Sequence, residues 1–119
     1  MKGARLLLAI WALAVAGPAW GHAFLERAEP RVGSTVKAAP TQVRTWFTQN
    51  LEPAFSTLEV VNERGERVDQ GVTRPDPGNP AALQIALKPI GAGTYQVKWR
   101  VLSVDTHVTE GDFTFKVHP

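Results

Sequence analysis

From His22 to the C-terminus, apolar residues recur at every second position, and turn-forming residues interrupt them about every ten residues. The clearest case runs from Thr94 to Leu102, where the apolar positions are Tyr95, Val97, Trp99 and Val101. Successive strand residues point to opposite faces, so this alternation predicts a strand with one buried and one solvated face. No stretch after His22 has the period of an amphipathic helix. The sequence therefore predicts an all-β fold.

The same alternation predicts further strands. They are expected at Val43 to Phe47, Thr57 to Val61, Arg67 to Val72, Leu83 to Leu87 and Phe113 to Val117. The strand from Arg67 should form a hairpin with the strand from Thr57 across the turn at 62–65. Residues 73–80 hold three prolines and should form an exposed loop.

About seven short strands in one small domain predict two antiparallel sheets packed as a Greek-key β-sandwich, with immunoglobulin-like or cupredoxin-like topology. The core candidates are the aromatic residues on the apolar faces of these strands. They are Phe47, Tyr95, Trp99 and Phe113.

The start of the chain has a different character. A short basic segment precedes an apolar run from Leu6 to Ala16, and the small residues Ala19 and Gly21 stand before the expected cut. This is the three-part pattern of a secretory signal peptide that is cut before His22. The apolar run is shorter than the ~20 residues of a membrane-spanning helix, and a buried N-terminal helix is the alternative. We therefore predict a signal peptide at 1–21 and one exported domain at 22–119.

The composition excludes several kinds of site. The chain has no cysteine, which excludes disulfides and thiolate metal sites. Without Lys2 and Arg5 the basic and acidic residues balance, so no basic patch predicts nucleic-acid binding. Only three histidines are present, and no Ser/His/Asp triad or Gly-rich phosphate loop stands out.

These histidines are His22, His107 and His118. As the first residue of the exported domain, His22 would offer an α-amine and an imidazole in one chelate. Asp105 and His107 form an Asp-x-His pair, and residues i and i+2 of an extended segment point to one face. Three nitrogens and one oxygen suit Cu(II) best, fit Zn(II) or Ni(II), and are too nitrogen-rich for calcium or magnesium. Taken alone, an Asp-x-His is more often a hydrogen-bonded turn than a metal site.

Three further side chains need an interpretation. His118 has the opposite parity to the apolar residues of the last strand, so it should face solvent. Glu110 either accepts a hydrogen bond from a ligand imidazole or is simply solvated. Trp46 lies on the face opposite Phe47, where it either packs beneath the metal-binding loops or covers a sheet edge.

The two ends of the predicted domain resemble the copper resistance protein CopC family of periplasmic copper carriers. The similar motifs are His22-Ala23-Phe24-Leu25, Glu29-Pro30, Gly33, the stretch from Gly93 to His107, and the stretch from Gly111 to Val117. The resemblance implies a seven-stranded β-sandwich in which His22, Asp105 and His107 bind Cu(II).

The chain departs from the family pattern at three points. Thr106 stands where the family usually has glycine, between the aspartate and the histidine. Gln49 supplies an amide where a glutamate sometimes assists the copper, so we do not assign it as a ligand. Many relatives carry a methionine-rich stretch for Cu(I), whereas Met1 is the only methionine here. We therefore expect one Cu(II) ion per chain and no Cu(I) site.

The leading hypothesis is a monomeric periplasmic protein that sequesters or carries one Cu(II) ion in copper resistance and homeostasis, and hands it to an inner-membrane copper transport protein. It would be neither an enzyme nor a nucleic-acid binder. The alternative is a copper-dependent oxidative enzyme, because a histidine-brace site also pairs an N-terminal histidine with a second histidine. A third hypothesis is an adhesion-like sandwich without metal.

Overall fold

The computed structural model describes residues 22–119. In it the chain forms eight strands and one short 3-10 helix. The elements are β1 (Leu25–Glu29), β2 (Thr35–Val36), β3 (Gln42–Phe47), η1 (Pro53–Phe55), β4 (Thr57–Val61), β5 (Asp69–Asp76), β6 (Asn79–Leu87), β7 (Gly93–Leu102) and β8 (Val108–Val117). The predicted signal peptide at 1–21 lies outside the described residues. Within the described part, no helix has the length and apolar character needed to cross a membrane.

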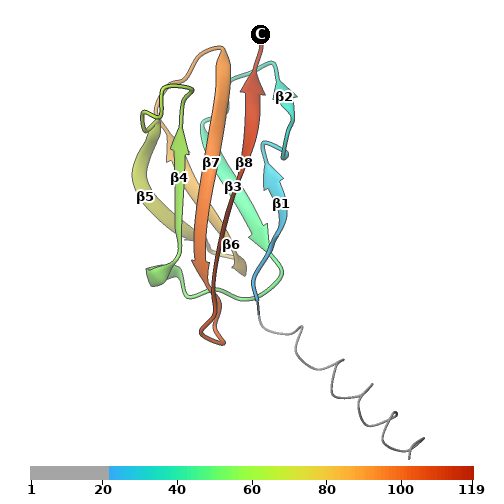
Figure 1. Cartoon of the computed structure of the whole chain (residues 1–119), viewed down its shortest axis with the longest axis vertical. Helices are drawn as coiled ribbons and strands as arrows, with labels where there is room; N and C mark the ends of the chain where they lie inside the picture. Colours follow the sequence, from blue (N-terminus) through green and yellow to red (C-terminus); the bar gives the residue numbers. More distant parts are fainter. Residues whose placement is uncertain (1–21) are drawn as a thin grey trace, which may run out of the picture.

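The strands form two four-stranded sheets that pack as a sandwich (Figure 1). One sheet has the order β1-β3-β6-β5 and the other β2-β8-β7-β4. All neighbouring strands are antiparallel except β2 and β8, which are parallel. The chain changes sheet repeatedly, for example between β3 and β4 and between β6 and β7. The predicted all-β sandwich is confirmed, with eight strands in place of about seven.

The predicted hairpin between the strands from Thr57 and Arg67 is wrong. The chain pairs with β4 only next to the turn, at the bridge between Val61 and Arg67, and β5 then pairs with β6 in the other sheet. The later contacts of β5 with β4 are made by side chains, such as that of Thr73, which accepts the Leu58 N–H at 3.0 Å. The expected loop at 73–80 is wrong too, because β5 continues to Asp76 and β6 begins at Asn79. Pro75 is tolerated because β5 is an edge strand, where a missing N–H leaves no central ladder bond unmade.

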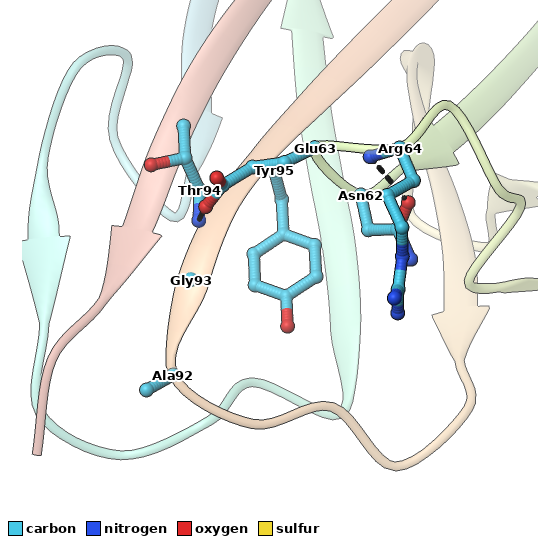
Figure 2. A pocket seen from close by; sticks show the side chains of 7 residues that line it. All are labelled: Asn62, Glu63, Arg64, Ala92, Gly93, Thr94 and Tyr95. Atoms are coloured by element: carbon cyan, nitrogen blue, oxygen red, sulfur yellow. Dashed lines mark hydrogen bonds between the residues drawn. The ribbon is translucent and has the colours of Figure 1, made fainter.

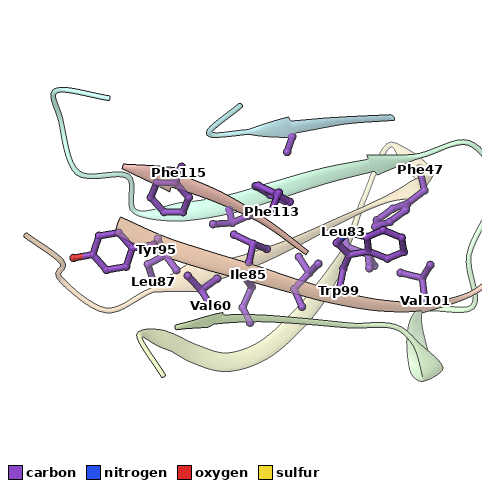
Figure 3. Close-up of a cluster of buried hydrophobic side chains, with 14 of the residues drawn as sticks. Phe47, Val60, Leu83, Ile85, Leu87, Tyr95, Trp99, Val101, Phe113 and Phe115 are labelled. Atoms are coloured by element: carbon purple, nitrogen blue, oxygen red, sulfur yellow. The ribbon is translucent and has the colours of Figure 1, made fainter. Parts of the chain in front are cut away.

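The core lies between the two sheets (Figure 3). The four predicted core aromatics, Phe47, Tyr95, Trp99 and Phe113, are all at least nine-tenths buried. Phe47 and Trp99 meet edge to face across the sandwich, with ring centroids 5.3 Å apart. Gly111 lies directly opposite Trp99 on β8, where a Cβ atom would approach the indole ring to 2.5 Å. Glycine at this position therefore allows the indole to lie against β8.

Trp46 lies half-buried on the outer face of β3. The guanidinium of Arg27, on the edge strand β1, lies 3.9 Å from the ring centroid, and that of Arg44 lies 4.9 Å away. Cation–π contacts of this kind stabilise the aromatic ring against the sheet surface. Trp46 therefore packs on the outer surface of the sheet at an inner strand, and the alternative in which it covers a sheet edge is not confirmed.

Candidate metal-binding site

Two segments that are far apart in the sequence meet at one end of the sandwich. The ladder between β7 and β8 ends at the pair Leu102 and Val108, and the hairpin loop that carries Asp105 and His107 follows. Figure 1 shows this loop at the end opposite the C-terminus, beside the segment that leads into β1. The fold therefore brings His22 to the Asp-x-His pair.

Side-chain hydroxyls from both sheets hold the segment at residues 22–24. Thr48, just after β3, donates its hydroxyl to the His22 carbonyl at 3.3 Å and accepts the Phe24 N–H at 3.0 Å. Thr109 of β8 donates its hydroxyl to the carbonyl of Ala23, which is fully buried. The backbone of His22 is thus fixed even though it precedes the first strand.

The β7–β8 loop is a short connection closed by Ser103 and His107. The Ser103 N–H donates to the His107 carbonyl at 3.0 Å, and the Thr106 N–H donates to the Ser103 carbonyl at 2.9 Å. A three-residue hairpin loop typically ends in a residue with left-handed backbone conformation, which is most often glycine. Thr106 fills that position with a φ of 72°.

The three predicted ligands are neighbours at this end. The rings of His22 and His107 have centroids 4.6 Å apart and are tilted by 52°. His107 Nδ1 lies 3.4 Å from Asp105 Oδ1, and the two side chains are 51% and 41% exposed, respectively. Both are therefore open to solvent and to an incoming ion.

The side chains are nevertheless not in a ligating arrangement. Within residues 22–119, no three His, Cys, Asp or Glu residues form a ready metal-ligand group. Asp105 instead contacts Ser103 and His107. For a metal ion to bind these two residues, His107 and Asp105 would have to exchange their mutual contact for the ion by rotation of their exposed side chains.

The electrostatics of the loop favour an ionised carboxylate. The Ser103 hydroxyl, and secondarily His107, hold the pKa of the Asp105 carboxyl below its ordinary value, although partial desolvation opposes them. Carboxylates bind metal in the deprotonated form. The lowered pKa therefore favours the deprotonated, metal-binding form of Asp105 at neutral pH.

The remaining candidates are not part of this arrangement. His118 follows β8 at the opposite end, is exposed, and donates its backbone N–H to Val36. Glu110 is 73% exposed and pairs with Arg100 at 3.8 Å, which agrees with the solvated alternative. Gln49 is exposed in the bend after β3, next to Asn50, whose carbonyl accepts the Val104 N–H.

Sequence reasoning missed the residues that support the site, above all Ser103. A signal for it exists in the strand pattern. The alternation Tyr95, Val97, Trp99, Val101 continues to Ser103, which places a hydroxyl at a buried position of the apolar face. A buried hydroxyl needs a hydrogen-bond partner, so it points to a nearby polar group.

A pocket of about 340 Å³ lies at the other end of the sandwich (Figure 2). It is formed by the turn after β4 and the start of β7. Glu63 there accepts the Thr94 N–H at 2.8 Å, and the Tyr95 hydroxyl donates to the Gly91 carbonyl at 2.8 Å. The side chains of Glu63 and Tyr95 thus already have hydrogen-bond partners within the protein, and the lining contains no histidine.

Comparison with known proteins agrees with this description. The family model of the CopC domain matches residues 25–118. Protein YobA of Escherichia coli strain K12 is 31% identical over 121 residues, which cover 98% of this chain and 95% of YobA. The copper transport protein CutJ of Bacillus subtilis is 26% identical over 113 residues, which cover 94% of this chain and 21% of CutJ.

The fold also matches a solved structure. The crystal structure of CopC from Methylosinus trichosporium OB3b is 34% identical in sequence and aligns with a TM-score of 0.76. The alignment covers 82% of this chain and 95% of that chain. The chain therefore belongs to the CopC family of copper-binding resistance proteins.

Proposed function

We propose that this protein is a periplasmic carrier of one Cu(II) ion. The ion is held between the mature N-terminus and the β7–β8 hairpin by the α-amine and imidazole of His22, the carboxylate of Asp105 and the imidazole of His107. The observation that carries the proposal is the contact between the His22 and His107 rings, whose centroids are 4.6 Å apart although 84 intervening residues separate them in the chain.

The donor set favours Cu(II) for two reasons. Nitrogen and oxygen donors suit the tetragonal geometry of this ion, and Asp105 is a hard ligand that disfavours Cu(I). Met1 is the only methionine, so the mature domain has no thioether for Cu(I). The amine ligand exists only after cleavage before His22, so the site is completed by export.

The exposure of the ligands supports a role in transfer. Asp105 and His107 are about half exposed on a loop at one end of the sandwich, so a second protein can approach the bound ion. CutJ, which is named as a copper transport protein, contains a region similar to this chain. We include delivery to an inner-membrane copper transport protein in the proposal.

A Cu(II) titration with electron paramagnetic resonance tests the site. The protein is the mature chain that begins at His22, compared with a variant that carries one extra N-terminal residue, with His107→Ala, and with the control His118→Ala. We expect one equivalent of Cu(II) in a tetragonal, nitrogen-rich site. Its spectrum should change in the extended chain and in His107→Ala and stay unchanged in His118→Ala.

Two results would refute the proposal. Equal spectra from the mature and extended chains would show that the N-terminus is not a ligand. Production of hydrogen peroxide with ascorbate, at a rate well above that of free copper, would favour the oxidative enzyme over the carrier.

A further inference from the structure

Ser103 connects the buried face of β7 to the metal-binding loop. Its side chain is fully buried, and its hydroxyl donates to Asp105 Oδ1. The same oxygen accepts the His107 N–H at 3.3 Å and lies 3.2 Å from the His107 carbonyl oxygen. One hydroxyl thus contacts both loop residues that bind the ion in the proposed function.

The hydroxyl has one proton to donate, and the carboxylate is its stronger acceptor. Hydrogen bonds to an ionised acceptor are shorter and roughly twice as strong as those to a neutral carbonyl. Ser103 engages Oδ1 of the carboxylate, so Oδ2 is the oxygen that turns toward the ion once His107 exchanges its contact with Oδ1 for the metal.

We propose that Ser103 is the positioning residue of the copper site: its hydroxyl holds Asp105 Oδ1 and the His107 backbone so that Oδ2 and the His107 imidazole meet the ion. This inference rests on the proposed function. Partners that hydrogen-bond to a metal ligand orient it and raise its affinity for the metal.

A purely structural role for the hydroxyl is the competing explanation. The backbone already closes the loop, because the Ser103 N–H and carbonyl both form hydrogen bonds across it. The isolated bridge between Leu51 and Ser103 joins this position to the segment after β3. These backbone contacts close the hairpin, and the hydroxyl adds its contacts with the two ligand residues to them.

Ser103→Ala tests the inference, with Ser56→Ala as a matched control. Ser56 is also a buried serine at this end, and its hydroxyl donates to the Glu52 carbonyl and accepts the Leu102 N–H. Cu(II) affinity is measured by competition with a chelator, the site by electron paramagnetic resonance, and the metal-free fold by thermal unfolding. Ser103→Ala should bind Cu(II) about 10- to 100-fold more weakly with an altered hyperfine coupling. Ser56→Ala should keep the wild-type affinity and spectrum.

A double-mutant cycle shows whether Ser103 acts through Asp105. In the Asp105→Ala background, most of the loss caused by Ser103→Ala should disappear, because the oxygen that the hydroxyl orients is gone. Additive losses would show that Ser103 acts independently of the ligand and would overturn the inference.

The outcomes separate this inference from the proposed function. A wild-type mature chain that binds no Cu(II) would refute the proposed function itself. Wild-type affinity and an unchanged spectrum in Ser103→Ala would refute the positioning role alone. If Ser103→Ala does not fold, Ser103→Gly removes the same hydroxyl, and loss of folding in both variants would assign Ser103 a structural role instead.

Discussion

Thr106 has a backbone conformation that its own side chain disfavours. Its φ of 72° lies in the left-handed region, where a β-branched residue is strained by about 1–3 kcal/mol. Part of this strain is offset by the bond from its hydroxyl to the Asp105 carbonyl at 2.6 Å. The residue between the two proposed hairpin ligands is therefore held in place by the closed loop.

Thr106→Gly should make the metal-free protein more stable, by about 0.5–1 kcal/mol, because glycine adopts this conformation without strain but loses more entropy on folding. Denaturant unfolding of the mature chain measures the change. Thr106→Ala is the control, since alanine keeps a Cβ atom and most of the strain. Equal stability of the glycine and alanine variants would contradict the argument.

At the scale of elements, Asp69 joins the two sheets. It begins β5 in one sheet, and its buried carboxylate accepts the Val60 N–H of β4 in the other at 2.8 Å. It also accepts bonds from the Arg67 guanidinium at 2.8 and 3.1 Å and from the Gly71 N–H at 2.8 Å. Burial raises the pKa of Asp69, but these bonds outweigh it and keep the pKa below the ordinary 3.8.

Asp69→Asn should therefore destabilise the metal-free protein at pH 7 by about 3 kcal/mol, because an amide nitrogen would face N–H donors in a buried position. Asp76→Asn is the control. Asp76 pairs with Arg44 at 3.0 Å near the surface, where such a pair contributes up to about 1 kcal/mol. Equal losses in the two variants would contradict the special role of Asp69.

The same carboxylate implies a direction for acid unfolding. The pKa of Asp69 is lower in the folded state than in the unfolded state. Its contribution to the free energy of unfolding is therefore present above pH 3.8 and is lost as the pH falls through the folded pKa. Wild type should lose more stability than Asp69→Asn between pH 5 and the acid limit of folding. Denaturant unfolding at a series of pH values measures this difference. Parallel curves of stability against pH for the two proteins would contradict the prediction.

At the scale of the whole molecule, a bound copper ion would join the start of the described chain to the β7–β8 hairpin. These segments already meet through the His22 and His107 rings and through the bond from Thr109 to Ala23. A ligand that binds only the folded state stabilises it by mass action. Copper binding should therefore be visible as stabilisation of the entire domain.

Cu(II) at a free concentration 100-fold above Kd should add about 2.7 kcal/mol to the stability of the mature chain, which corresponds to a rise in Tm of roughly 10 °C or more for a domain of this size. Scanning calorimetry measures the shift. His118→Ala should show the same rise, and the chain with one extra N-terminal residue a smaller one. A rise of equal size in the extended chain would argue against the N-terminal ligand.

The strands were largely predictable, because the alternation of side chains is a local property of extended backbone. The range Thr57–Val61 and the buried faces of β7 and β8 follow from it directly. The resemblance and the position of His22 also pointed to the three candidate ligands.

Pairing and support required the tertiary structure. The choice of β6 over β4 as the partner of β5 depends on pairing between residues that are distant in the sequence, such as Asp69 and Leu87. The approach of His22 to His107 depends in the same way on the hydroxyls of Thr48 and Thr109, which come from opposite sheets. A local pattern determines which way a side chain points, whereas only the packed sandwich determines which side chain it meets.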